Sequence, residues 1–151
     1  MTRVAIHGFG RIGRQVFKAL WHYHQGDAEV VAIGLSDVAA ARAAAHLLKY
    51  DSNYGRFAPE VRADGDRLLV ADRSIPLVAA STPSGLPWGR LGVDVVVDAT
   101  GAHAGGRLAA GHLEAGAAKA IVAAPSEDAD FTLIVGVNDG AYDPAAHHVV
   151  S

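Results

Sequence analysis

The 151-residue sequence contains no cysteine, and this absence excludes several kinds of site within it. Without a thiol, these residues cannot form a disulfide framework, a thiolate metal site or a cysteine nucleophile. Long apolar runs are also missing, since no segment approaches the roughly 18 uninterrupted apolar residues that predict a transmembrane helix. The formal net charge is only −3. No basic field is therefore present that would attract nucleic acid or an anionic membrane.

The composition is otherwise typical of one globular domain. Hydrophobic residues make up 50% of the chain, which is long enough to bury a substantial core. We therefore expect a single domain over residues 1–151. The chain enters its first predicted strand by Arg3, which leaves no room for a signal peptide, and a cytoplasmic protein is expected.

The most informative segment is a glycine-rich turn between an apolar strand and a helical pattern. Residues 2–6 predict a buried strand, and Gly8-x-Gly10-x-x-Gly13 follows it directly. In this setting the motif indicates a dinucleotide-binding βαβ unit. Gly8 permits a tight turn, Gly10 leaves room for a pyrophosphate, and Gly13 lets the helix pack close to the strand. The first N–H groups of the helix point at the anion, and Arg11 has a better claim on that anion than Arg14.

Periodicity along the rest of the chain predicts an α/β fold with a doubly wound, mostly parallel sheet. Apolar segments predict strands at 29–35, 93–98, 118–123 and 131–135, and a final strand that begins at 148. Helical patterns cover 11–23, 38–48 and 106–115, and a short helix containing Trp88 is expected over 83–91. Short alternating segments between residues 56 and 80 predict a small antiparallel excursion rather than more parallel sheet.

Three further segments are candidates for contact with a dinucleotide. Asp37 lies at close to the expected spacing for the acid that binds the adenosine ribose, and capping of the next helix is its alternative role. Thr100 and Gly101 follow the strand at 93–98, at the carboxyl edge where ligands bind in such sheets. Residues 124–126 follow the next strand at the same edge. Plain loop geometry is the alternative explanation for both of these segments.

The eight histidines raise the question of a metal site. The close pairs are His22 with His24 and His147 with His148. Neither pair has the i, i+4 spacing of a helical metal site, and no cysteine joins them. We therefore interpret these histidines as surface or helix-end residues, and we predict no metal. His46 lies on the apolar face of a predicted helix and is expected to be a hydrogen-bonded core residue.

Several ordered motifs resemble those of phosphorylating glyceraldehyde-3-phosphate dehydrogenases. The sequence IHGFGRIGR at 6–14 resembles the opening of that family. A second signature is HLLKYDS at 46–52 with GRF at 55–57, and a third set is TG at 100–101, APS at 124–126 and GVN at 136–138. The resemblance covers the whole chain. LPW at 86–88 and LGVDVV at 91–96 are also similar to the related erythrose-4-phosphate dehydrogenases.

The resemblance implies a Rossmann-type NAD-binding domain whose site residues match the family's motifs. The cofactor-binding residues that it implies are Gly8, Phe9, Gly10, Arg11, Ile12, Gly13, Asp37, Thr100, Gly101 and Ala124. A carboxylate at Asp37 would repel the 2′-phosphate of NADP, so NAD is the expected cofactor. Thr100 and Gly101 would face the nicotinamide half. His7 stands where the family usually has asparagine.

The resemblance also places the family's catalytic residues beyond Ser151. In the family, the stretch matching residues 149–151 is followed at once by Asn-Ala-Ser-Cys-Thr-Thr-Asn, whose cysteine attacks the aldehyde, and a histidine in the second domain acts as base. We therefore expect the cofactor-binding half of a homotetrameric enzyme that oxidises a phosphorylated sugar aldehyde with hydride transfer to NAD. These residues alone are expected to be inactive. The alternative is a stand-alone, non-catalytic dinucleotide-binding or assembly module.

Overall fold

A computed structural model describes residues 1–101 and 106–151 of the chain. In chain order, with η for 3-10 turns, the elements are β1 (Thr2–His7), α1 (Arg11–Tyr23), β2 (Ala28–Gly34), η1 (Val38–Ala40), α2 (Ala41–Lys49), β3 (Tyr50–Asp51), β4 (Gly55–Arg56), β5 (Val61–Asp64), β6 (Arg67–Val70), β7 (Arg73–Val78), η2 (Pro83–Gly85), β8 (Val95–Asp98), α3 (Gly106–Ala109), α4 (Gly111–Glu114), β9 (Lys119–Val122), η3 (Asp139–Ala141) and β10 (Val149–Val150). No helix among these is long and apolar enough to cross a membrane.

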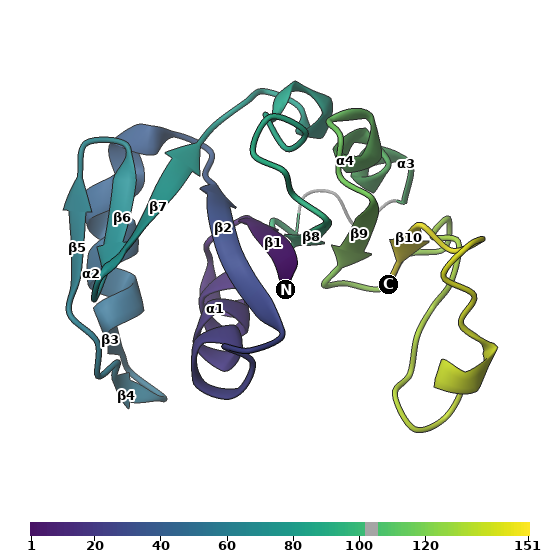
Figure 1. The fold of residues 1–151 in the computed structure, drawn as a ribbon, viewed down its shortest axis with the longest axis horizontal. Coiled ribbons are helices and arrows are strands. Elements are labelled where there is room, and N and C mark those ends of the chain that lie inside the picture. Colours follow the sequence, from purple (N-terminus) through teal and green to yellow (C-terminus); the bar gives the residue numbers. More distant parts are fainter. Residues whose placement is uncertain (102–105) are drawn as a thin grey trace.

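Eight of the strands form one twisted sheet in the order β10-β9-β8-β1-β2-β7-β6-β5 (Figure 1). The strands from β10 to β7 run parallel to their neighbours. Numbered along the chain, these parallel strands follow the 3-2-1-4-5-6 order of doubly wound dinucleotide-binding folds. The predicted fold class is therefore confirmed.

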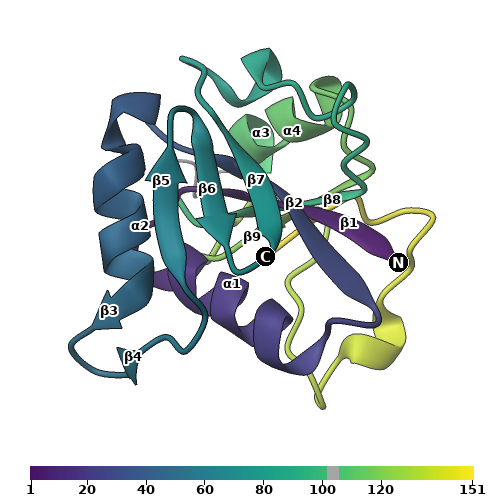
Figure 2. The ribbon, with the colours of Figure 1, turned by 60° about the vertical axis from the view of Figure 1, so that its left-hand side comes forward.

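Two apolar layers cover the two faces of the sheet. Because side chains alternate along a strand, Ile6 and Ile33 enter one core cluster, whereas Ala5 and Ala32 enter the other. Residues of α1 and α2 fill the first cluster, and the segment around Trp88 fills the second. Helices α3 and α4 lie above the strands and α1 lies below them in Figures 1 and 2.

The antiparallel excursion exists, but part of it belongs to the parallel sheet. β6 pairs antiparallel with both β5 and β7. The second half of β7 also pairs in parallel with β2, where Leu77 and Val78 lie opposite Ile33 and Gly34. The prediction that this region adds no parallel sheet is therefore wrong, since β7 serves as the third parallel strand.

The predicted helix over 83–91 is wrong, since only the single turn η2 forms there. Leu86 follows it with extended backbone (ψ 147°). Pro87 explains this break, because a proline ring pushes the preceding residue out of the helical region. Trp88 consequently lies in a turn and is fully buried against the sheet.

The predicted strand at 131–135 is also wrong. Phe131 makes only an isolated bridge to Val150. The Ser151 N–H donates to the Phe131 carbonyl at 2.9 Å and the Leu133 N–H donates to the Ser151 carbonyl at 2.8 Å, so the pairing with the end of β10 is short. On the other edge of the segment, the Asn138 Oδ1 accepts the Ile134 N–H at 2.7 Å, and its Nδ2 donates to the Thr132 carbonyl at 2.9 Å. A side-chain amide therefore binds one edge of the backbone, and no full strand forms.

Two smaller expectations need correction as well. The predicted helix at 106–115 is divided into the short helices α3 and α4. His46 is exposed rather than buried, and its ring lies 5.0 Å from the ring of Tyr50. The apolar stripe of α2 instead consists of residues such as Ala41, Ala45 and Leu48.

Candidate cofactor-binding site

The glycine motif lies where the order of strands reverses. β1 pairs with β2 on one side and with β8 on the other, so both neighbours end beside Gly8. The Gly8 N–H donates to the Gly34 carbonyl at 2.9 Å, and the Ala99 N–H donates to the His7 carbonyl at 2.7 Å. Ligands of doubly wound sheets bind at the carboxyl ends of the strands at such a point. The fold therefore brings the glycine loop to the turn that follows β8.

Two glycines of the motif are required by the protein itself. Gly8 has a φ of +89°, and a Cβ at this position would lie 2.5 Å from the backbone nitrogen of Thr100. A Cβ on Gly13 would overlap the carbonyl oxygen of Gly8. These contacts hold helix α1, the loop and the end of β8 together closely, as the motif predicted.

Gly10 differs from the other two glycines. Its φ of −72° is open to any residue, and a Cβ there would meet no described atom within 4 Å. Gly10 also precedes α1, which has no side-chain cap and no acidic residue in its first turn. The leading N–H groups of such a helix offer hydrogen bonds and a positive dipole end to an anion. The position therefore combines open space with the uncapped helix start that the motif predicts for a phosphate.

A cleft of about 610 Å³ opens beside this loop. Its lining joins the loop and strand ends to one face of α2 and to the turn after β7: His7, Gly8, Phe9, Gly10, Leu35, Ser36, Ala40, Ala43, Ala44, Leu47, Ala80, Ser81, Thr82 and Thr100. This volume lies within the roughly 300–1,000 Å³ of small-molecule and cofactor sites. The lining is mostly apolar with a few hydroxyl groups, which suits a nucleoside.

Comparison with known proteins agrees with this geometry. A family model described as "Glyceraldehyde 3-phosphate dehydrogenase, NAD binding domain" matches residues 2–105. The glyceraldehyde-3-phosphate dehydrogenase of Geobacillus stearothermophilus is 48% identical over 150 residues, and that of Bacillus subtilis, numbered 1, is 44% identical over 150 residues. Each alignment covers 99% of this chain and 44% of the relative.

The chain belongs to the glyceraldehyde-3-phosphate dehydrogenase family. It carries the family's NAD-binding domain, so the predicted cofactor, NAD, is confirmed at the level of the domain. The family itself consists of NAD-dependent oxidoreductases. The chain spans less than half the length of the curated relatives it matches.

The structure distributes the predicted NAD contacts over more than one surface. Gly8, Phe9, Gly10 and Thr100 line the cleft. Arg11 and Ile12 line a second hollow of about 500 Å³ on the other side of Leu47. Among the described linings of these two hollows, Gly13, Asp37, Gly101 and Ala124 do not occur. Gly13 packs α1 against the loop. The cofactor contacts of Gly13, Asp37, Gly101 and Ala124 stay predictions.

Asp37 is exposed and caps the turn that leads into α2. Its Oδ1 accepts the Ala39 N–H at 2.8 Å, and its own backbone is extended. Its neighbours Ser36 and Ala40 both line the cleft. The capping role is therefore observed, and the ribose role stays a prediction. The capping bond uses Oδ1, and the ribose role would use the second oxygen of the carboxylate.

The two arginines of the motif lie in different surroundings. Arg14 is buried, and its Nη1 donates to the Phe9 carbonyl at 3.0 Å, while its Nε has no described hydrogen-bond partner. Arg11 is exposed. Arg14 thus supports the loop backbone and is not a solvated charge. Arg11 is the more exposed of the two, and its contact with an anion stays a prediction.

The family's second signature is structural in this fold. Asp51 accepts the backbone N–H groups of Asn53 and Tyr54, at 2.9 and 3.0 Å, and these bonds lower the pKa of its carboxyl. Its other oxygen accepts from Gln15 at 3.0 Å and lies 3.7 Å from the Lys18 ammonium. The signature therefore ties the β3–β4 hairpin to α1, which carries the glycine motif at its start.

Sequence reasoning did not assign the small residues of α2 to the site. Ala40, Ala43 and Ala44 face the cleft, and Leu47 separates it from the second hollow. An alanine-rich helix face was the available signal, since small side chains leave room beside a sheet. The hydroxyl of Thr82 was missed because this residue lies between the predicted excursion at 56–80 and the predicted helix at 83–91 and was assigned to neither.

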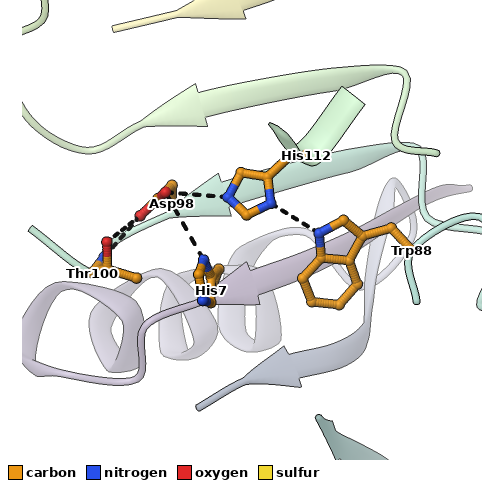
Figure 3. A network of polar contacts seen from close by, with 5 residues as sticks. All are labelled: His7, Trp88, Asp98, Thr100 and His112. Carbon is orange, nitrogen blue, oxygen red and sulfur yellow. Dashed lines mark hydrogen bonds and ion pairs between the residues drawn. The ribbon is translucent and has the colours of Figure 1, made fainter. Parts of the chain in front are cut away.

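A buried polar network lies directly behind the turn after β8 (Figure 3). Asp98, at the end of β8, accepts the N–H and the hydroxyl of Thr100 on Oδ1, at 3.0 and 2.7 Å. Its Oδ2 lies 3.1 Å from Nε2 of His112 and 3.9 Å from Nδ1 of His7. Trp88 donates its indole N–H to Nδ1 of His112 at 2.9 Å. His7, Asp98, His112 and Trp88 are all buried.

The charge state of Asp98 follows from these partners. Burial by itself would raise the pKa of the carboxyl, but the hydrogen bonds from His112 and Thr100 outweigh it and hold the pKa well below its usual range. Asp98 is therefore a carboxylate at neutral pH. Sequence reasoning placed Asp98 at a strand end but assigned it no role, because its partners come from separate elements.

Proposed function

We propose that residues 1–151 form one domain that holds NAD for a dehydrogenase acting on a phosphorylated sugar aldehyde. The observation that carries the proposal is the open position of Gly10 at the uncapped start of α1, beside a cleft of about 610 Å³. The pyrophosphate would lie against the loop from Gly8 to Gly13. The cofactor supplies the hydride acceptor, and this chain's residues bind and orient it.

The ends of the cofactor are assigned from the two sides of the cleft. The adenosine would lie along α2, with its ribose hydroxyls at Asp37 and near the hydroxyls of Ser36 and Ser81. The nicotinamide half would lie towards Thr100, Gly101 and Ala124. In this orientation the adenosine lies beyond the carboxyl end of β2 and the nicotinamide lies beyond the carboxyl end of β8. The carboxylate of Asp37 would repel the 2′-phosphate of NADP and so favour NAD.

A direct titration tests the binding proposal. We expect NAD to release heat and to raise the melting temperature of the 151-residue chain, with NADP binding more weakly. Calorimetry with NAD, NADP and adenosine as separate ligands measures this order. A chain that binds none of the three would contradict the proposal, and preferential binding of NADP would contradict the role of Asp37.

The catalytic part of the proposal concerns residues outside this sequence. The 151 residues hold no cysteine, so no thiohemiacetal of the family's type forms on them. We expect no NADH when the purified chain is mixed with NAD, phosphate and either glyceraldehyde 3-phosphate or erythrose 4-phosphate. Turnover that stays with the 151-residue species would contradict this expectation. The family's homotetramer and the cytoplasmic location also stay predictions.

The alternative, a non-catalytic dinucleotide-binding or assembly module, keeps the same loop. Reading the coding sequence past Ser151 separates the two proposals. A continuation that contains Ser-Cys-Thr-Thr-Asn supports the dehydrogenase, and a stop codon supports the module.

A further inference from the structure

Trp88, His112 and Asp98 form a chain of hydrogen bonds that ends at the cofactor cleft. Trp88 and His112 are fully buried, and Asp98 is 2% exposed. Figure 3 shows the imidazole of His112 between the indole and the carboxylate, with Thr100 on the far side of Asp98. Neither Trp88 nor His112 lines the cleft as described. Their hydrogen bonds reach the cleft through Asp98, and the His112 ring also lies 5.1 Å from the ring of His7, which lines the cleft.

The indole determines which nitrogen of His112 carries the proton. An indole N–H is a donor only, so Nδ1 of His112 must accept and must lack a hydrogen. A neutral imidazole then carries its proton on Nε2, which donates it to Oδ2 of Asp98. This geometry also argues against a metal, although His7, Asp98 and His112 present ligand atoms within 4.8 Å of one another. A metal-bound histidine keeps an N–H on its other nitrogen, and here that nitrogen accepts a hydrogen bond.

The other oxygen of Asp98 sets the position of the turn that closes the cleft. Its Oδ1 holds both the N–H and the hydroxyl of Thr100. The Thr100 nitrogen is also the atom closest to a Cβ placed on Gly8, at 2.5 Å. A small shift of Asp98 would therefore move the Thr100 turn against the first glycine of the loop.

We propose that Trp88 and His112 are positioning residues for the cofactor site. Trp88 keeps His112 in the Nε2–H form, and His112 in this form holds Asp98 and Thr100 in the geometry that receives NAD. This inference rests on the proposed NAD cleft. Asp98 would be held from both sides, by His112 on one oxygen and by the Thr100 turn on the other. The lock depends on the direction of the hydrogen bonds, and not only on the packing of the rings.

Exchange of the carboxylate for an amide tests that direction. In Asp98→Asn, the amide nitrogen faces a donor in either orientation, namely Nε2–H of His112 or the N–H of Thr100. We expect NAD affinity to fall about tenfold, because two donors then face each other and displace the Thr100 turn. Trp88→Phe removes the indole donor and frees His112 to place its proton on Nδ1. Nε2 then accepts from the amide at position 98.

The double variant therefore gives the distinguishing result. Trp88→Phe with Asp98→Asn should bind NAD more tightly than Asp98→Asn alone, although it has lost one more native group. Simple loss of packing would make the double variant weaker than either single one. Trp21→Phe is the matched control, because Trp21 packs on the opposite core cluster. This control combined with Asp98→Asn should give no recovery.

Nitrogen NMR of histidine-labelled chain provides a readout that does not need NAD. We expect His112 to show a bare Nδ1 and a protonated Nε2, and Trp88→Phe to change this pattern and move the Thr100 amide signal. A proton on Nδ1 in the unmodified chain, an unmoved Thr100 signal, or a double variant without recovery would each overturn the inference. If the unmodified chain binds no NAD, the proposed function fails, and the two NMR signals still decide whether Trp88 and His112 position Thr100.

Discussion

Substitution of the three glycines of the motif should separate the needs of the fold from the needs of the ligand. Gly8→Ala places a side chain at φ +89° and 2.5 Å from the Thr100 nitrogen. A non-glycine residue in the left-handed region costs about 1–3 kcal/mol, and overpacking against fixed backbone costs a similar amount. We expect a loss of at least about 2 kcal/mol of unfolding free energy. In a domain of this size that loss corresponds to a fall of at least about 4–8 °C in melting temperature.

Gly10→Val should behave in the opposite way. Its backbone accepts any residue, and its Cβ would meet no described atom within 4 Å, so the unfolding free energy should change by less than about 1 kcal/mol. The branched side chain would instead occupy the space assigned to the pyrophosphate. Loss of one hydrogen bond to a charged group costs about 1.5–3 kcal/mol, and we therefore expect NAD affinity to fall at least about tenfold.

Scanning calorimetry measures the melting temperatures, and titration calorimetry measures the affinity for NAD. Gly26→Val is the matched control, because a Cβ at Gly26 also meets no described atom within 4 Å and Gly26 lies in the turn after α1, outside the described cleft lining. If Gly10→Val binds NAD as tightly as Gly26→Val, the pyrophosphate does not lie at Gly10. If Gly8→Ala has the same melting temperature as the unmodified chain, the close approach of the loop to Thr100 is not a feature of the protein.

Three further predictions concern single groups. Asp37→Ser keeps a capping oxygen, so the unfolding free energy should be unchanged while the preference for NAD over NADP becomes smaller. Asp37→Ala should show the same smaller preference and should also lose about 1 kcal/mol of unfolding free energy. An unchanged preference in both variants would mean that Asp37 is only a helix cap. The pKa of Asp98 in the folded chain lies below its value of about 4 in the unfolded chain. The ionised carboxylate therefore contributes its full stabilisation above about pH 5, and this contribution is lost as the pH falls. The unfolding free energy of Asp98→Asn, measured with urea, should depend less on acid pH than that of the unmodified chain, and an equal dependence would refute this. Equimolar zinc should leave the melting temperature unchanged, and a rise that disappears in His112→Phe would show that the buried cluster binds metal.

The parts of the fold that the sequence predicted are those with a local cause. The first strand, α1 and β2 each carry a periodic apolar pattern, and the glycine motif marks the turn between them. Even the distinct roles of Gly8 and Gly13 were predicted, since the motif has one physical explanation wherever it connects a strand to a helix. Such signals need no knowledge of distant neighbours.

The errors arose where a distant group replaced the local preference. An apolar segment at 131–135 predicts a strand, but its backbone pairing with the end of β10 stops at Leu133. The Asn138 side chain binds its other edge, and Ile134 remains 55% exposed. His46 lies one position from buried Ala45, and a small rotation of the helix places it outside the core. Periodicity predicts a face of a helix, whereas packing decides where that face ends.

The polar network was invisible to the sequence because each bond joins a different pair of elements. Trp88 and His112 are 24 residues apart, and His112 and Asp98 are 14 residues apart. One available signal was His7, which departs from the family's usual asparagine beside the loop. Its ring lies close to His112, at 5.1 Å between centroids, and Gly34 leaves room for it, since a Cβ at Gly34 would lie 2.6 Å from His7 Cδ2.

The strand order explains why the site and the network share one location. From β1 the chain first adds strands on one side, through β2 and β7, and later returns to add β8, β9 and β10 on the other. Right-handed connections then leave the connecting helices of the two halves on opposite faces of the sheet, so the loop after β1 and the turn after β8 diverge and a crevice opens between them. Gly8 and Thr100 touch at its base. A polar group such as Asp98, placed at the end of β8, is at once buried by α4 and adjacent to that crevice. The topology that creates space for a dinucleotide therefore also creates a buried position, occupied by Asp98, that fixes the Thr100 turn at the base of the crevice.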